Sequence, residues 1–345
     1  MIETIYILMI GITALFFLLI FLLIYIVWKR VQETKMKAKM KQYIKVHKDE
    51  WYLYLIEEKN ISEKLIPNNM GEQKAIEEIL VRYTKNILSH TVITKISNYV
   101  EENMEDYYRK KLKSRKWSTR MNVLYKIIDF QMHFLIKDVL EMLNSNKKYS
   151  KEEYLQMYKI LSHFRYENFI EHILNPKFLI GEFEYKQLLF DMDPNDFGLF
   201  VQKYEELPDT LKYIIIDIIG IKNNIEYIQF LESKLADPQL EVRIRTLKSI
   251  NRIGAITDIN LYIPFIQSNY WEERLMVAKL LIHVPLAESK DHLKELLQDS
   301  SWWVRSEAAQ TLRNHKMGKQ VLESIIISSE DRYAVDMAKE VLGKG

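Results

Sequence analysis

The residues of this sequence that could do chemistry are histidines, carboxylates and one dense tract of basic side chains. Eight histidines are scattered along the chain, and none belongs to an HExxH motif. Three arrangements could hold a cation or share a proton: Asp129 with His133, Glu288 with His292, and Asp191 with Asp193. Surface ion pairs explain the first two spacings, and a loop beside Pro194 explains the third. We therefore expect no metal ligands.

Motifs for covalent or phosphate chemistry are also missing. The sequence contains no GxxxxGK[ST], GxGxxG or GxSxG motif, so it lacks a phosphate-cradling loop and a nucleophile elbow. It contains no cysteine, which excludes disulfides, thiolate metal sites and cysteine nucleophiles. We expect no catalytic residue and no cofactor, and hence a protein that is not an enzyme.

The basic tract is the strongest candidate for binding an anion. Its seven cations are interleaved with Tyr107, Tyr108 and Trp117, which would suit phosphates of nucleic acid or lipid. An acidic run precedes it, and a solvated helix face is the simpler interpretation. The members of this tract are Arg109, Lys110, Lys111, Lys113, Arg115, Lys116 and Arg120.

A long apolar segment opens the chain and predicts a transmembrane helix. Residues 5–28 carry no charge, and at about 1.5 Å per residue they exceed the hydrocarbon core of about 30 Å. A cleaved signal peptide would need a basic start, a shorter apolar core and a small-residue cleavage site. The start carries Glu3 and no Lys or Arg, while Tyr25 and Trp28 suit an interfacial belt.

The residues after this segment predict its orientation. Residues 29–48 hold eight basic residues and one acid, a net charge of +7 in a chain whose total is +2. The positive-inside rule places this side in the cytoplasm, with the N-terminus outside and the cell membrane as the location. The same cations could attract anionic lipid headgroups. We name six of them as candidate membrane-surface residues: Lys29, Arg30, Lys35, Lys37, Lys39 and Lys41.

The C-terminal half repeats with a period of 31 residues. Lys212, Arg243, Arg274 and Arg305 share one column, and apolar residues recur four and seven positions after each. Trp271 and Trp302 stand three positions before their arginines, as Trp117 does before Arg120. Asp237 and Asp299 are suitable helix caps. The segments YIQFLESKL, LYIPFIQS and LKELLQD each predict a first helix, so two helices fit each row.

The row LQDSSWWVRSEAAQTL resembles the core of a HEAT repeat, with an acidic turn residue before a Val-Arg pair and small and large apolar residues after it. The other rows depart from it: LADPQLEVRIRTLKSI lacks the small residues, and SNYWEERLMVAKLL lacks the acid and the Val. The resemblance implies an α-solenoid of stacked helix pairs. It also implies that Arg243, Arg274 and Arg305 form a ladder between repeats with Trp271 and Trp302 packed beside them, the alternative being a partner-facing surface.

Together these features predict an all-α chain in three parts: an anchor over 1–28, a basic juxtamembrane segment and helical stalk over 29–104, and HEAT-like repeats over 105–345, clearest over 205–345. The predicted function is a membrane-anchored scaffold for a protein partner associated with the membrane, such as a polysaccharide glycosyltransferase. Nucleic-acid binding by residues 107–120 and a ligand-responsive regulatory domain are the alternatives. Residues 205–345 hold 18 basic and 21 acidic residues, which argues against nucleic acid.

Overall fold

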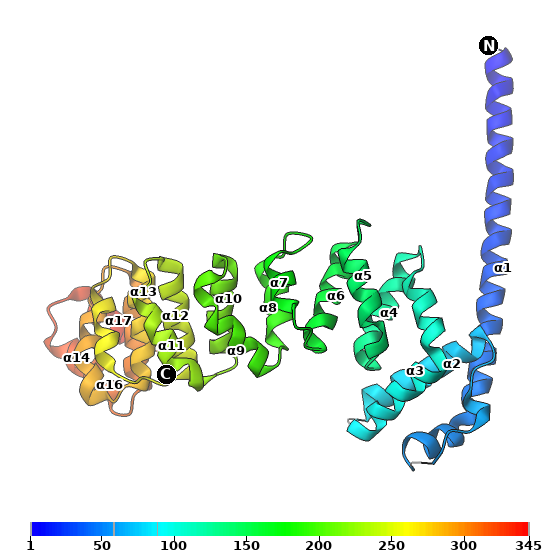
Figure 1. Ribbon diagram of the computed structural model, residues 1–345. Coiled ribbons are helices and arrows are strands. Elements are labelled where there is room, and N and C mark those ends of the chain that lie inside the picture. The colour runs from blue at the N-terminus through cyan, green and yellow to red at the C-terminus, as the bar shows by residue number, and fades with distance from the viewer. Residues whose placement is uncertain (1, 58, 88, 344–345) are drawn as a thin grey trace. The chain divides into compact units, whose positions relative to one another are not determined.

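The chain is all-helical, as the sequence predicts. The computed structural model describes residues 2–57, 59–87 and 89–343, with side chains from residue 9 onward, and no strand occurs in these ranges (Figure 1). The chain divides into two units, Met1–Phe164 and Arg165–Gly345. We describe each unit by itself.

Unit 1 is built from six α-helices and two short 3-10 helices within its described residues. The helices pack through their apolar faces: α1 contacts α2 and α3, while α4 contacts α3 and α6. The helices are α1 (Ile2–Leu55), η1 (Glu63–Leu65), α2 (Met70–Asn86), α3 (His90–Leu112), α4 (Trp117–Asp129), η2 (His133–Leu135), α5 (Ile136–Asn144) and α6 (Lys151–His163).

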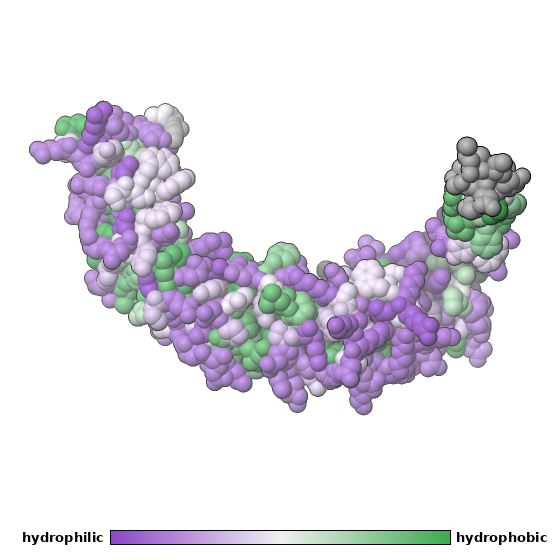
Figure 2. Space-filling model, turned by 90° about the horizontal axis from the view of Figure 1, so that it is seen from above, coloured by the Kyte–Doolittle hydropathy of each residue, from purple (hydrophilic) through white to green (hydrophobic). Residues whose placement is uncertain are grey.

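The first helix, α1, combines an apolar segment with a packed end. It is the one helix in the described residues that is long and apolar enough to cross a membrane, and no residue of its most apolar stretch is buried. Figure 2 shows the visible part of its apolar segment, next to the grey atoms, as a green surface. Toward its other end Trp51 and Leu55 are fully buried against the body of unit 1. A single helix therefore joins the candidate span to the folded body.

Neither predicted domain boundary, after residue 28 or after residue 104, coincides with the end of a helix. The helix α1 passes residue 28 without interruption, and the boundary between residues 104 and 105 lies inside α3. Met104, Tyr107 and Tyr108 are all buried on this helix. The apolar face of α3 therefore continues across the predicted boundary between residues 104 and 105.

Unit 2 continues with helices and short 3-10 turns. Its longer helices pack in sequence, α8 on α10, α10 on α12, α12 on α13, α13 on α15, and α15 on α17. The α-helices are α7 (Phe169–Leu174), α8 (Glu182–Phe190), α9 (Pro194–Gln202), α10 (Asp209–Ile221), α11 (Ile228–Ser233), α12 (Leu240–Ile253), α13 (Trp271–Leu280), α14 (Leu286–Leu296), α15 (Trp302–Asn314), α16 (Gly318–Ser328) and α17 (Arg332–Gly343). The 3-10 helices are η3 (Tyr204–Glu206), η4 (Ile225–Tyr227), η5 (Lys234–Ala236), η6 (Ile259–Leu261), η7 (Ile263–Gln267) and η8 (Leu281–His283).

The 31-residue period corresponds to the packed face of successive helices. The eight apolar residues of its two columns are buried, at or below 1% exposure, in or directly after α10, α12, α13 and α15. Burial of each isoleucine or leucine side chain among them contributes on the order of 1.5–3 kcal/mol, and the smaller alanine side chains contribute less. They are Ile216, Leu247, Ala278 and Ala309 in one column, and Ile219, Ile250, Leu281 and Leu312 in the other.

One of the three segments predicted as the first helix of a repeat does not form an α-helix. The segment LYIPFIQS forms the 3-10 helices η6 and η7, whereas the segments YIQFLESKL and LKELLQD contribute to α11 and α14. Pro264 stands at the second position of η7. Proline lacks an N–H and disfavours the helical conformation of the residue before it, here Ile263, which explains why no α-helix forms there.

Asp237 and Asp299, which the sequence predicts as helix caps, are not the N-cap residues of their helices. The N-cap residues of α12 and α15 are Gln239 and Ser301, two positions later. Each aspartate instead accepts a hydrogen bond from the backbone N–H of the residue two positions on, at 2.8 and 2.7 Å. These are Asx turns, which shape the loop before the helix rather than cap its first turn.

A close contact between α10 and α12 depends on one glycine. A Cβ atom added at Gly220 would lie 2.7 Å from the Cα of Ser249, whose hydroxyl donates to the carbonyl of Ile216 at 2.9 Å. We expect Gly220→Ala to cost about 1–3 kcal/mol in the free energy of unfolding, because the two helices must separate.

Urea unfolding of the full-length protein in detergent would measure this cost, and Gly198→Ala in α9 is the control. A Cβ at Gly198 would meet its nearest atom, the hydroxyl of Tyr227, at 3.5 Å, which is ordinary contact. In a helix interior that substitution should stabilise by about 0.5–1 kcal/mol. Equal effects of the two substitutions would contradict the proposed close contact.

Candidate functional site

Four arginines occupy the same position in four different helices. Arg120, Arg243, Arg274 and Arg305 are each the fourth residue of their helices, α4, α12, α13 and α15. Each donates from Nη1 to the carbonyl oxygen six residues earlier, at 2.7 to 2.9 Å. These carbonyls lie in the loop before the helix and have no helical partner, so the arginine satisfies them and fixes the loop.

Three of these arginines also bind a carboxylate of a following helix pair. The Nε of Arg120 lies 2.7 Å from Oε1 of Glu153, and the Nε of Arg243 lies 2.6 Å from Oε1 of Glu273. Glu153 and Glu273 are the third residues of α6 and α13. Charge-assisted hydrogen bonds of this kind link consecutive repeats and are stronger than neutral ones.

The third inter-repeat contact is bidentate. Arg274 donates from Nε and Nη2 to the two carboxylate oxygens of Asp299, at 2.5 and 2.9 Å. This hydrogen bonding raises the pKa of Arg274 above its usual value. The paired carboxylate also closes the Asx turn before α15, so one side chain serves both the contact between repeats and the start of the next helix.

The two ends of the predicted column differ from its middle. The guanidinium of Arg305 stacks over the ring of Tyr333 at 4.9 Å, a cation–π contact with α17. Lys212 instead pairs with Glu205, which precedes it in the chain, at 3.7 Å. The column of basic residues therefore makes inter-repeat contacts mainly where the residue is arginine.

Aromatic side chains gather at the starts of α13, α15 and α17. Trp271 and Trp302 are the first residues of their helices and are 38% and 46% exposed, and Trp303 is 60% exposed. The rings of Trp302 and Trp303 meet edge to face, with centroids 4.9 Å apart. Arg274 of α13 binds Asp299 just before α15, and Arg305 of α15 stacks on Tyr333 of α17, so the starts of these three helices lie close together. We call this set the aromatic row: Tyr270, Trp271, Trp302, Trp303 and Tyr333.

The basic tract is not one solvated helix face. It runs from the end of α3 through a loop into α4, and several of its members are held in ion pairs. Arg109 and Lys113 bind the buried carboxylate of Asp138, and Arg120 binds Glu153. Lys111 binds Glu77. The exposed members that carry no ion pair in the described part of the chain are Lys110, Arg115 and Lys116.

The six juxtamembrane cations have a different environment. Lys29, Arg30, Lys35, Lys37, Lys39 and Lys41 are all exposed on α1, and none of them pairs with a carboxylate in the described residues. Tyr25 and Trp28, just before them, are exposed as well. These side chains are therefore available to solvent or to headgroups, and no part of the folded body neutralises them.

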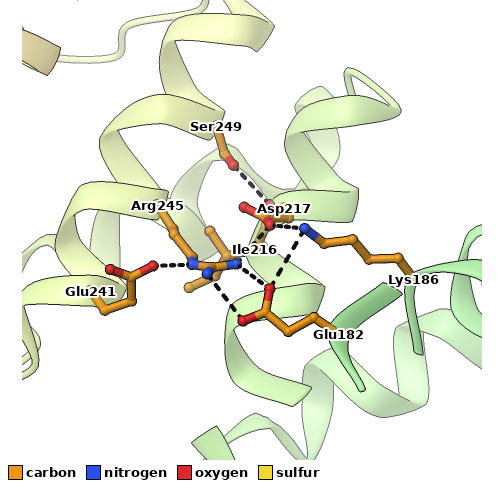
Figure 3. Close-up of polar contacts among 7 residues, drawn as sticks. All are labelled: Glu182, Lys186, Ile216, Asp217, Glu241, Arg245 and Ser249. Carbon is orange, nitrogen blue, oxygen red and sulfur yellow. Dashed lines mark hydrogen bonds and ion pairs between the residues drawn. The ribbon is translucent and has the colours of Figure 1, made fainter. Parts of the chain in front are cut away.

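A second cluster of charges joins α8, α10 and α12. The nearly buried carboxylate of Asp217 accepts from Nη1 of Arg245 at 2.8 Å and also pairs with Lys186, while Glu182 and Glu241 surround the guanidinium (Figure 3). Three carboxylates thus meet two cations, and Figure 3 shows each cation directed at acids of neighbouring helices. The cluster fastens three helices together rather than presenting a free reactive group.

The carboxylates singled out for metal binding have structural contacts. Asp193 caps α9 by accepting from the backbone N–H of Asn195 at 2.9 Å, and it also binds Arg165. Asp129 ends α4, whereas His133 lies in η2, so these two do not share a helix face. Among the described residues no group of three or more His, Asp or Glu side chains is placed to hold a metal ion.

Comparisons with known proteins give no family. No protein-family model and no curated protein matches the sequence. Among solved structures, two engineered proteins are similar at 14% and 16% identity, over 77% and 90% of this chain and 94% and 95% of theirs, with TM-scores of 0.26. Human deoxyhypusine hydroxylase in complex with glycerol is similar at 10% identity, over 89% of this chain and 96% of that one, with a TM-score of 0.28. These TM-scores carry no argument, so function must be inferred from the residues of this chain.

Proposed function

We propose that this protein is a single-pass membrane scaffold whose helical body binds a protein partner in the cytoplasm. The anchor is the apolar part of α1, whose unburied surface in the described residues leaves it available to lipid. The exposed cations after Trp28 support an orientation with the body on the cytoplasmic side. The unbroken helix from this segment into the buried Trp51 supports retention of the segment in the mature protein.

We propose further that the helix pairs within each unit are HEAT-like repeats, beginning near Trp117 in unit 1. The support is the recurrence of one set of contacts: arginine at the fourth helix position, the carbonyl six residues earlier, and an acid of the next pair. Arg120 makes this set in unit 1 as Arg243 and Arg274 do in unit 2. Within a unit, stacked pairs share a core and leave surfaces free for partners.

The aromatic row carries the scaffold proposal. Tryptophan and tyrosine are enriched among residues that dominate protein–protein binding energy, and exposed tryptophans at adjacent helix starts form such a surface. The packed core and the arginine ladder already stabilise these helices, so the exposed rings are left for a partner. A partner confined to the same membrane would meet this surface at a raised effective concentration, and modest affinity would suffice.

Co-purification from detergent tests this function. The triple variant Trp271→Ser, Trp302→Ser, Trp303→Ser should lose about tenfold or more of a partner that native full-length protein retains, because each such ring contributes on the order of 2 kcal/mol. Ile327→Ser in α16, which removes an 86% exposed apolar side chain, is the matched control and should retain the partner. Absence of any retained partner, or equal loss in both variants, would remove the support for a scaffold.

A further inference from the structure

A cavity of about 710 Å³ lies in unit 1 between α1, α2, the end of α3 and the start of α4. Its volume is within the usual range for small-molecule sites, roughly 300–1,000 Å³. The apolar part of its lining comes from Met40, Met70 and Val81. Hydroxyl and amide groups come from Ser118, Thr119 and Asn122 of α4. The site therefore combines an apolar side with hydrogen-bonding groups.

Positive charge dominates the polar part of this cavity. Its lining includes four lysines, Lys74, Lys111, Lys116 and Lys126, and two glutamates. One glutamate, Glu78, binds Arg82, which does not line the cavity. The acids that remain are too few to neutralise the lysines, so the cavity has an excess of positive charge.

The other glutamate holds only two of the four lysines. Oε1 of Glu77 lies 2.7 Å from the Nζ of Lys126, and Oε2 lies 3.7 Å from the Nζ of Lys111. In the described ranges Lys74 and Lys116 form no ion pair. Burial lowers the pKa of Lys111, the nearby charge of Glu77 raises it in part, and the neighbouring charges of Lys126 and Lys74 lower it again. Crowded ammonium groups of this kind favour occupation by an anion.

The start of α4 adds donors to the same cavity. Its N-cap residue, Lys116, makes no side-chain hydrogen bond to the first turn, and Ser118 and Thr119 of that turn line the cavity. Arg120 fixes the preceding loop by donating to the carbonyls of Ser114 and Arg115 at 2.9 Å. A helix N-terminus held in this way presents backbone N–H groups and the positive end of the helix dipole.

We propose that this cavity binds a soluble phosphate-bearing small molecule of about nucleotide size, held by Lys74, Lys111, Lys116 and Lys126 and by the start of α4. The site is in a different unit from the aromatic row and needs no protein partner. Failure of either proposal would therefore leave the other standing.

The position of the cavity along α1 favours a soluble ligand over a lipid headgroup. Met40 is twelve residues beyond Trp28 on a continuous helix, which corresponds to about 18 Å at 1.5 Å per residue. The headgroup layer on each side of a bilayer is only about 5–8 Å thick. If the proposed anchor spans the membrane, a phospholipid phosphate stays well short of the cavity.

Calorimetric titration of the full-length protein in non-ionic detergent tests the site, with inorganic pyrophosphate and ATP as probes. We expect saturable binding of at least one probe, and at least about tenfold weaker binding by Lys74→Gln, Lys116→Gln, because each lost charged hydrogen bond weakens an anion's affinity. These two lysines form no ion pair in the described residues, so the variant should fold normally.

The control is Lys110→Gln, Arg115→Gln, which removes the same charge from the same basic tract at exposed positions that do not line the cavity. Its affinity should match that of the native protein. Absence of binding by the native protein would overturn the proposal, and so would equal losses in the two variants, since that result would indicate unspecific attraction to the tract.

A second arm separates a soluble ligand from a lipid headgroup. Pyrophosphate affinity is compared in nanodiscs of phosphatidylcholine alone and with added phosphatidylglycerol, at about 0.15 M salt. The Debye length is then about 8 Å, so the surface potential should be weak at the cavity. Unchanged affinity is expected for a soluble ligand, and competition by phosphatidylglycerol would overturn that part of the proposal.

Discussion

Replacing Glu153 with alanine should destabilise unit 1 by about 3–5 kcal/mol, because it leaves the guanidinium of Arg120 buried without its charge partner. Arg120 and Glu153 are 7% and 1% exposed, and their closest atoms are 2.7 Å apart. The substitution also removes the carboxylate that accepts from the backbone N–H of Ser150 in the capping box of α6. Urea unfolding of the full-length protein in detergent, followed by circular dichroism, would measure the loss.

Two further variants separate the ion pair from other effects. Arg120→Met with Glu153→Leu removes both charges and should recover part of the stability, although the carbonyls of Ser114 and Arg115 lose their donor. Asp336→Ala breaks an exposed pair with Arg332 and should cause no measurable change. If Glu153→Ala behaves like Asp336→Ala, the contact between repeats does not stabilise the fold.

The arginine column illustrates how far the sequence leads. The 31-residue period and the recurring apolar positions identify the buried faces of the helices, because stacking requires the same side-chain sizes in each row. The partner acids could not be found in this way. Glu153, Glu273 and Asp299 follow their arginines by 33, 30 and 25 residues, so they occupy no common column.

For the basic tract, closeness in the sequence was a poor guide to which residues share a site. Its members lie close together in the sequence, but the structure directs Arg109 and Arg120 to buried acids and leaves only Lys111 and Lys116 at the cavity. The other two lysines, Lys74 and Lys126, come from α2 and the middle of α4. No short-range spacing connects these four residues, because the packing of several helices brings them together.

The aromatic row could be predicted from the sequence only in part. The recurrence of tryptophan three positions before arginine was visible in the sequence, and it places the indole at the first position of each helix. Its exposure was not predictable, since the same position could pack against the neighbouring repeat. Trp117 shows such a link, donating from Nε1 to the hydroxyl of Ser150 at 3.0 Å while remaining 47% exposed.

Removing residues 1–28 should transfer the protein from the membrane to the soluble fraction. The deleted stretch contains the whole uncharged segment, whereas a chain that begins at Lys29 keeps the part of α1 that lines the cavity and buries Trp51 and Leu55. A chain that begins near residue 45 would lack part of this packed helix. Its behaviour would then not distinguish loss of the anchor from loss of the fold. Carbonate washing of membranes followed by immunoblotting measures the distribution.

A matched substitution tests whether hydrophobic insertion, rather than electrostatic attraction to lipid, holds the protein. Phe17→Arg with Phe21→Arg places two charges at the centre of the apolar segment, each costing about 2.5–3.5 kcal/mol on insertion scales, and should release full-length protein. Replacing Lys35 and Lys39 with glutamine removes exposed cations and should leave the protein resistant to carbonate, because an inserted helix needs no headgroup attraction to stay. Release by the glutamine variant but not by the arginine variant would mean that the cations, and not a spanning helix, hold this protein at the bilayer.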